Sequence, residues 1–345
     1  MTVSMFDHLL SMSDDIGLFE HAELAVARPE HGYCTDDMAR LLVVISRESE
    51  PDRPVRELAR TAIKFLAGAQ RVDGKIRNRR SARGRWSGGH SVDDCWGRSL
   101  WAFGTAARLA PEEWMRQSCL AYFGHGIQQR SPSPRAMAFA ALGAVDVATA
   151  HPTHRGARLL LNDAVTTIGR PASNRDWPWP EERLAYANAA LAEALMAAGD
   201  LLGRPEVTGD GITMLRWLLD RETVGSHLSP TPVDGAGPAD TPPAFDQQPI
   251  EVAAMADACH RAYLVTDDAE WLRGIEMAAE WFAGDNDAGI AMWDSETGGG
   301  YDGLHTSGPN MNQGAESTLA LVSVRQHARH LVTTNGHARA SSLFA

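Results

Sequence analysis

Carboxylic acids stand where several helices are predicted to start, and they are the side chains of this sequence best suited to chemistry. The acids in question are Asp36, Asp37, Asp93, Asp94, Glu251 and Glu316. One acid in the first turn of a helix is ordinary, because the helix dipole favours negative charge there by about 0.3–1 kcal/mol. Several acids that meet in one cavity repel one another and raise each other's pKa. We therefore interpret the set as functional, with one carboxyl as proton donor and another as base.

Two of these segments, CTDDMAR and SVDDCWGR, place an acid pair ahead of an arginine. Asp36 precedes Arg40 by four residues, and Asp94 precedes Arg98 by four, so each pair shares one face of a helix. Such an arginine can hold one carboxylate ionised and leave its neighbour free to act, although a simple ion pair within the helix explains the spacing equally well. Within the pairs we prefer Asp37 and Asp94 as catalytic groups.

Aromatic and hydrogen-bonding side chains gather near these acids. In the segment DWPWPEE two tryptophans are separated by proline, which excludes a helix interior and fixes the backbone. Flat aromatic faces beside carboxylates and amides suit sugars, which stack through C–H groups and hydrogen-bond through hydroxyls. The predicted substrate-binding residues are His31, Tyr33, Arg40, Trp86, His90, Trp96, Arg98, Trp177, Trp179, Glu182, Gln248, Tyr301, His305 and Gln313.

The charge of the chain excludes several kinds of partner. The 345 residues include 32 Lys and Arg against 44 Asp and Glu, a net charge of −12. An acidic surface repels phosphate backbones and anionic lipids, so we expect neither nucleic acid nor membrane as a partner. No apolar run approaches the roughly 20 residues of a membrane helix, and Asp7 and His8 interrupt the place of a signal peptide. We expect a cytoplasmic protein.

The sequence offers little support for a cofactor or a metal. Its four cysteines, Cys34, Cys95, Cys119 and Cys259, are far apart and in apolar surroundings, which favours free buried thiols. The motifs GxGxxG after a strand, GxxxxGK[ST], GxSxG and HExxH are absent. The acid pairs lack the further ligands from one loop that a divalent cation usually requires. We therefore expect no cofactor and no metal site.

Two kinds of helix alternate along the chain. One-sided apolar stripes predict amphipathic helices at 55–66, 114–123, 159–168, 212–219 and 271–282, and a short apolar segment at 5–10 supplies a sixth. Segments that are apolar or small on every side predict buried helices at 38–45, 100–107, 136–145, 184–198, 252–258 and 319–322. Six hairpins of about 57 residues use the whole chain.

This alternation is typical of an all-α (α/α)6 toroid, in which an outer ring of helices encloses an inner ring. The starts of the inner helices, with their acids, would open at one end. An α-solenoid is the alternative, but it should show a tighter repeat and polar capping helices. We expect one domain spanning residues 1–345. Segments 224–248 and 285–313 have little helical pattern, and we interpret them as functional loops over the open end.

Four strings of this sequence carry a resemblance to a known family: SDDIGLFEHA, HGYCTDDMARLL, DQQPIEVAAMADA and NQGAESTLA. They resemble a bacterial (α/α)6 module of the six-hairpin glycosidase-like proteins. The resemblance spans nearly the whole chain. Such modules are often found near or fused to glycosyltransferases, which implies a functional link to one. Met38 departs from the pattern, since a polar residue is expected after TDD. The resemblance implies carbohydrate chemistry in the cavity, usually inverting hydrolysis by two carboxyl groups.

The leading hypothesis is an inverting glycoside hydrolase that acts on an oligosaccharide or glycan. One acid from Asp36 and Asp37 or from Asp93 and Asp94 would oppose Glu251 or Glu316, roughly 6.5–9.5 Å away. A sugar epimerase, phosphorylase or lyase on the same fold is the first alternative. A non-catalytic glycan-binding accessory of a glycosyltransferase is the second.

Overall fold

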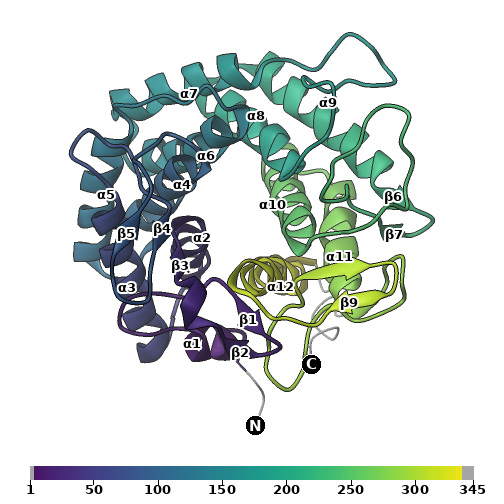
Figure 1. Ribbon diagram of the computed structural model, residues 1–345. Coiled ribbons are helices and arrows are strands. Elements are labelled where there is room, and N and C mark those ends of the chain that lie inside the picture. Colours follow the sequence, from purple (N-terminus) through teal and green to yellow (C-terminus); the bar gives the residue numbers. More distant parts are fainter. Residues whose placement is uncertain (1–3, 336–345) are drawn as a thin grey trace.

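The computed structural model describes residues 4–335 and contains two concentric rings of helices (Figure 1). Each inner helix contacts the next, and the last contacts the first, so the inner ring is closed. The inner helices are α2 (Thr35–Ser46), α4 (Asp94–Leu109), α6 (Pro134–Ala150), α8 (Asn188–Leu202), α10 (Pro249–Thr266) and α12 (Ala315–Asn335). The prediction of an all-α (α/α)6 toroid is confirmed.

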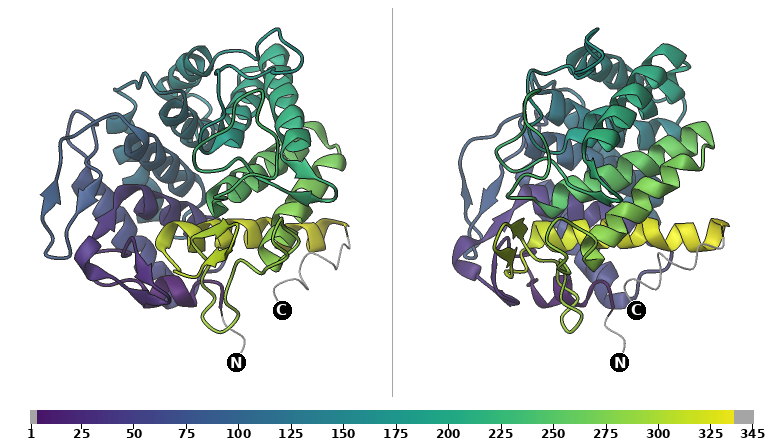
Figure 2. Two further views of the ribbon diagram at one scale, coloured as in Figure 1. Left: turned by 45° about the vertical axis from the view of Figure 1, so that its right-hand side comes forward. Right: turned by 90° about the vertical axis from the view of Figure 1, so that its right-hand side faces the viewer.

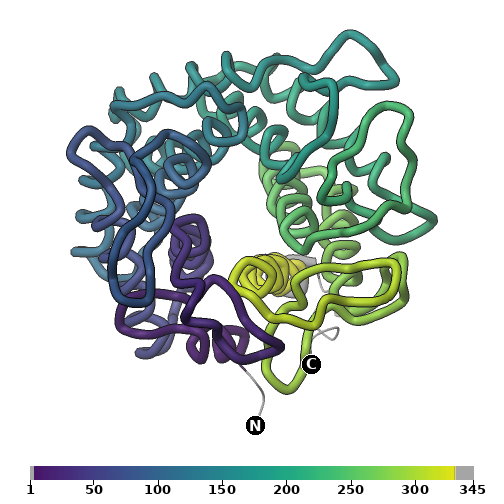
Figure 3. Tube along the Cα trace, in the orientation of Figure 1, coloured from purple at the N-terminus to yellow at the C-terminus, as the bar shows by residue number. Residues whose placement is uncertain are grey.

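The outer helices each follow an inner one and run back along it. They are α3 (Arg53–Ala69), α5 (Glu113–Gly126), α7 (Arg155–Ile168), α9 (Pro205–Arg221) and α11 (Glu270–Ala283). The sixth outer position is taken by α1 (Asp7–Ser11), which has only 5 residues and contacts α3 and α12. Figure 3 shows the chain passing once round the ring, so that its first helices lie beside its last.

Small residues allow the inner helices to approach closely. A Cβ atom added to Gly104 of α4 would lie 2.1 Å from the carbonyl oxygen of Gly143 in α6, and one added to Gly97 would lie 2.2 Å from that of Ala136. The inner helices α6 and α8 are buried along nearly their whole lengths. Apolar residues on all sides of the predicted inner helices therefore indicate that these helices are buried within the ring.

Short antiparallel strand pairs lie between the helices, where long irregular loops were expected. They pair β1 (Ala22–Glu23) with β2 (Val26–Ala27), β3 (Tyr33–Cys34) with β4 (Arg79–Arg80), β4 with β5 (Trp86–Ser87), β6 (Thr223–Val224) with β7 (His227–Leu228), and β8 (Gly303–His305) with β9 (Gly308–Asn310). The segment 285–313 thus contains the β8–β9 hairpin, and the segment 224–248 begins within the β6–β7 hairpin. Figure 2 shows β4–β5 and β8–β9 projecting on one side of the ring.

One predicted helix start is wrong. The helix expected at 184–198 begins at Asn188, because Ala187 adopts a left-handed backbone with φ 46° and Leu184 pairs with Ala236. Glu181 and Glu182 consequently lie in the preceding loop and not in a first helical turn.

The four cysteines are buried and free, as predicted. No helix in the described part of the chain is long and apolar enough to cross a membrane. The extent of the predicted single domain stays a prediction.

Candidate active site

A polar pocket of about 460 Å³ opens where the inner helices begin. The predicted site residues that line it are Asp36, Asp37, Arg40, Asp94, Arg98, Gln248 and Glu316. They come from the starts of α2, α4, α10 and α12, so ring closure brings together acids that are up to 280 positions apart in the sequence. Converging N-terminal ends of helices also favour negative charge at this place.

Arg40 joins two of these acids across neighbouring helices. Its guanidinium donates to Oδ1 of Asp37 at 2.6 Å and contacts Oε2 of Glu316, also at 2.6 Å. Asp37 is on α2 and Glu316 on α12, the first and last helices of the inner ring. One guanidinium therefore holds a carboxyl from each of these two helices.

The two carboxyls bound by Arg40 have different surroundings. Asp37 is 3% exposed, and its burial raises its pKa to about 7, against the attraction of Arg40, which lowers it. The side chain of Glu316 is 43% exposed and open to water. A buried carboxyl that keeps a proton near neutral pH, beside a wetter one, is the pairing that acid–base chemistry on a neutral substrate requires.

Arg98 makes a second, looser bridge. Its Nε lies 3.4 Å from Oδ1 of Asp36, and its Nη2 lies 3.9 Å from Oδ2 of Asp94. Burial lowers the pKa of Arg98, and its guanidinium lies 4.1 Å from the ring centroid of Phe139. The hydroxyl of Tyr186 donates to Oδ2 of Asp94 at 2.5 Å. The predicted contact between Asp94 and Arg98 is therefore present. Arg40 instead contacts Asp37, and Asp36 is bridged by Arg98, so each arginine also reaches an acid on a second helix.

A narrow apolar chamber of about 50 Å³ continues below the polar pocket and shares Arg40, Arg98 and Glu316 with it. Trp101 and Phe139 line this chamber, stacked with their ring centroids 6.0 Å apart. The pocket therefore has a polar, charged mouth and an aromatic base.

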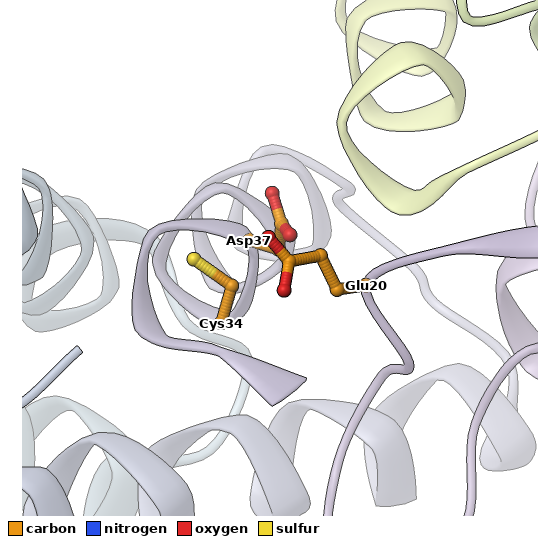
Figure 4. A group of neighbouring side chains, drawn as sticks. All are labelled: Glu20, Cys34 and Asp37. Atoms are coloured by element: carbon orange, nitrogen blue, oxygen red, sulfur yellow. The ribbon is translucent and has the colours of Figure 1, made fainter. Parts of the chain in front are cut away.

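Glu20, Cys34 and Asp37 offer ligand atoms within 4.8 Å of one another (Figure 4). This group fits a metal poorly. Glu20 is already paired with Arg79, and Asp37 with Arg40. Burial raises the pKa of the Cys34 thiol well above its ordinary value, whereas a metal binds the thiolate.

Glu251 and Asp93 lie outside the pocket lining. Glu251 is buried, and its carboxyl accepts from the backbone N–H of Ala187 at 2.5 Å and of Asn188 at 3.4 Å. Glu251 therefore accepts hydrogen bonds from N–H groups at the start of α8, which have no partner within the helix. Burial raises the pKa of Glu251 to about 8. Asp93 is the exposed residue that precedes α4.

Several predicted aromatic residues are in the core and not on the pocket wall. Trp177 and Trp179 pack against Trp217 of α9, with ring centroids 5.0 and 5.7 Å away. Trp96 donates its indole N–H to the carbonyl of Gly126. Tyr33 is buried, stacks on Phe19 and donates its hydroxyl to Asp14. Trp86, in β5, is partly buried and contacts Phe65. The buried rings add stability to the fold.

The remaining predicted binding residues also lie away from the lining. The ring of His305 contacts Asp246 at 2.5 Å, and the ring of His31 lies beside that of His21. The side chain of Gln313 makes hydrogen bonds with those of Thr297 and Asp294. Glu182 is exposed in the loop before α8, and Tyr301 packs on the core. Burial lowers the pKa of His90, which is outside the pocket.

Sequence reasoning missed seven polar residues of the lining: Glu20, His21, Arg79, Tyr186, Asp302, Asn310 and Ser317. Glu20 and His21 belong to the string SDDIGLFEHA, and the polar residues at the end of this string could have indicated a place in the site. Asp302 accepts from Ser317 and from the N–H of Gly314, and burial raises its pKa. Arg79 and Tyr186 reach the pocket only because of how β4 and the loop before α8 fold.

The fold is similar to that of several solved structures. A sugar epimerase from a ruminal bacterium matches with a TM-score of 0.70 at 10% identity, over 94% of this chain and 95% of that one. The cellobiose 2-epimerase of Spirochaeta thermophila matches with 0.67 at 14% identity, over 95% of each chain. The cellulase Cel9M of C. cellulolyticum in complex with cellobiose matches with 0.63 at 9% identity, over 91% and 88%. No protein-family model and no curated protein sequence matches.

These likenesses, at 14% identity or less, define the class of the fold. The chain is an (α/α)6 toroid with a carboxylate-rich pocket at the end where its inner helices start.

Proposed function

We propose that this chain is a carbohydrate-active enzyme that hydrolyses a glycosidic bond with inversion. The observation that carries the proposal is the pair of carboxyls held by Arg40: buried Asp37, with a pKa of about 7, and half-exposed Glu316. The sugar-processing names of the structural neighbours support carbohydrate chemistry on this fold, and the acidic pocket supports a mechanism based on carboxyl groups.

In the proposed reaction Asp37 donates its proton to the glycosidic oxygen as the bond to the anomeric carbon breaks. Glu316 takes a proton from a water molecule, whose oxygen bonds the same carbon from the opposite face. The products are a free alcohol and a sugar of inverted configuration, and the proton gained by Glu316 returns to Asp37 through solvent. Arg40 orients both groups, and Asp94 with Tyr186 offers a hydrogen-bonding wall.

An epimerase is the second candidate, favoured by His21 and by the epimerases among the structural neighbours. His21 is the only histidine among the described residues that line the pocket, and its ring lies 3.8 Å from Glu20. A phosphorylase has less support, because Arg40, Arg79 and Arg98 already contact carboxylates that a phosphate would have to displace.

The test is to incubate the protein with a panel of neutral oligosaccharides and follow the products by NMR. Hydrolysis gives new reducing ends of one anomeric configuration, whereas epimerisation changes a sugar without shortening the chain. We expect Asp37→Asn and Glu316→Gln to lower kcat by about 10²–10⁴. Trp179→Phe, in the core, is the matched control with normal turnover.

Normal turnover in both carboxyl variants contradicts the assignment of Asp37 and Glu316. Sugar binding without turnover in the wild type would instead favour the glycan-binding accessory. The link to a glycosyltransferase and the cytoplasmic location stay predictions.

A further inference from the structure

A short segment beside the pocket has a charge opposite to that of the whole chain. Residues 75–85, KIRNRRSARGR, hold six of the 32 basic residues and no acid, in a chain with a net charge of −12. We call this segment the basic arm. It includes β4 and the turn that leads to β5, so it forms the first half of the β4–β5 hairpin (Figure 1).

The basic arm is firmly attached to the pocket wall. Its β4 pairs with β3, with Cys34 opposite Arg79 and Tyr33 opposite Arg80, and β3 runs directly into the start of α2. The N–H of Thr35 donates to the carbonyl of Asn78. Ile76 is 1% exposed, so the arm is anchored in the core as well. A ligand held by the arm would therefore have a defined position relative to the pocket.

Part of the positive charge is already used by the protein. Arg79 lines the pocket and pairs with Glu20. Arg80 stacks over Trp86 and Phe65, at 5.2 and 5.6 Å from the ring centroids, and its Nε donates to the carbonyl of Gly84. These two arginines have structural partners.

The other four charges of the arm have no ion pair within the described residues. They are Lys75, Arg77, Arg83 and Arg85. Arg83 and Arg85 are exposed at the tip of the turn, where Ser81 and Gly84 hold the backbone in a compact loop. Figure 2 shows this hairpin on the same side of the ring as β8–β9, which supplies Asn310 to the pocket. The turn that carries Arg83 and Arg85 therefore lies on the face of the molecule that carries the pocket mouth.

We infer that the basic arm binds the anionic groups of an acidic glycan, outside the pocket. Guanidinium groups bind carboxylate, sulfate and phosphate well, and clustered positive charge attracts a chain of such groups. The pocket is dominated by carboxyls and repels them, so the anionic sugars lie outside it, along the arm. The rest of the protein surface is acidic, so it repels polyanions and does not bind them non-specifically. The identity of the partner as a glycan rests on the proposed function.

Calorimetric titration with two hexasaccharides tests this inference: α-1,4-linked galacturonate, which is anionic, and cellohexaose, which is neutral. We expect Arg83→Gln/Arg85→Gln to weaken galacturonate binding by about three- to tenfold and to leave cellohexaose unaffected. Galacturonate affinity should also fall as salt rises from 50 to 200 mM. Arg53→Gln/Arg155→Gln is the matched control, with the same loss of charge at exposed arginines on the outer helices α3 and α7.

Equal binding of the two hexasaccharides, no change in the arm variant, or an equal loss in the control variant would each overturn the inference. Tighter arm-dependent binding to phosphatidylserine vesicles or to a DNA oligonucleotide than to galacturonate would overturn it too, because the partner would be of another class. Titration requires no turnover. A wild type that binds galacturonate through the arm and cleaves no glycan refutes the proposed hydrolysis alone.

Discussion

Replacing Arg40 by glutamine should destabilise the protein in a way that depends on pH. Arg40 is the positive partner of both Asp37 and Glu316, at 2.6 Å from each. Burial raises the pKa of Asp37 from 3.8 to about 7, which at ~1.4 kcal/mol per pKa unit corresponds to roughly 4 kcal/mol. Because the folded-state pKa lies above the unfolded one, this stabilising proton binding is complete below pH 3.8 and is lost as pH rises to about 7.

At pH 8 Asp37 is ionised in the wild type, and Arg40 is its counter-charge. Breaking a buried ion pair costs about 3–5 kcal/mol, whereas a pair with a half-exposed partner such as Glu316 adds about 0–1 kcal/mol. At pH 6 Asp37 holds its proton with or without Arg40. The variant then loses only the ion pair with Glu316 and some packing of the Arg40 side chain. Without Arg40 the pKa of Asp37 rises further, so at pH 8 the buried carboxyl takes up a proton instead of staying charged. The extra loss is then limited to ~1.4 kcal/mol for each pH unit above the wild-type pKa of about 7. We expect Arg40→Gln to cost about 1–2 kcal/mol at pH 6 and about 1 kcal/mol more at pH 8.

Urea unfolding at pH 6 and pH 8 measures both losses. The double variant Asp37→Asn/Arg40→Gln is the control, since a neutral amide at position 37 requires no counter-charge and should remove the difference between the two pH values. An Arg40→Gln protein that loses the same free energy at both pH values would show that Asp37 is not the titrating group.

Three further predictions concern residues that support the site without lining it. Glu251→Gln should change turnover little and shift the free energy of unfolding at pH 7 by less than about 1 kcal/mol, whereas Glu251→Ala should lower that free energy by about 1–3 kcal/mol, because it leaves the N–H groups of Ala187 and Asn188 unbonded. A large loss of kcat in Glu251→Gln would show that this residue is catalytic. Trp179→Ala should cost about 3–5 kcal/mol in chemical unfolding and leave sugar affinity unchanged in calorimetry. Gly104→Ala should lower stability by about 1–3 kcal/mol or more, seen as a lower Tm, because the new Cβ meets a backbone oxygen at 2.1 Å; an unchanged Tm would show that α4 and α6 can separate freely.

The periodicity of apolar residues predicts the fold well because burial in a toroid has a simple pattern. Inner helices are covered on every side and outer helices on one, so the two kinds alternate in the sequence as they do in space. The prediction fails at the start of α8, where Ala187 takes a left-handed conformation that alanine rarely adopts. No residue type in that loop signals such a backbone.

The candidate site is only partly visible in the sequence, for a different reason. Acids in a first helical turn point to the right end of the ring, and Asp37, Asp94 and Glu316 do line one pocket. Aromatic residues are ambiguous, because a tryptophan beside proline can equally fill a gap between a loop and an outer helix. Trp179 does so, at 1% exposure against α9, whereas Trp101, within a regular helical pattern, reaches the chamber below the pocket.

Electrostatics in the pocket and closure of the ring depend on the same contacts. The inner helices α2 and α12 are the first and last of the ring, and they meet at a seam that no chain connection crosses directly. The Arg40–Glu316 pair spans this seam at the pocket end, and Gln326, which donates to the carbonyl of Val44 at 2.7 Å, spans it at the other end. The proposed acid, Asp37, and the proposed base, Glu316, therefore lie on opposite sides of the seam. Any opening of the ring there would separate them, which makes a closed toroid a condition for the proposed chemistry.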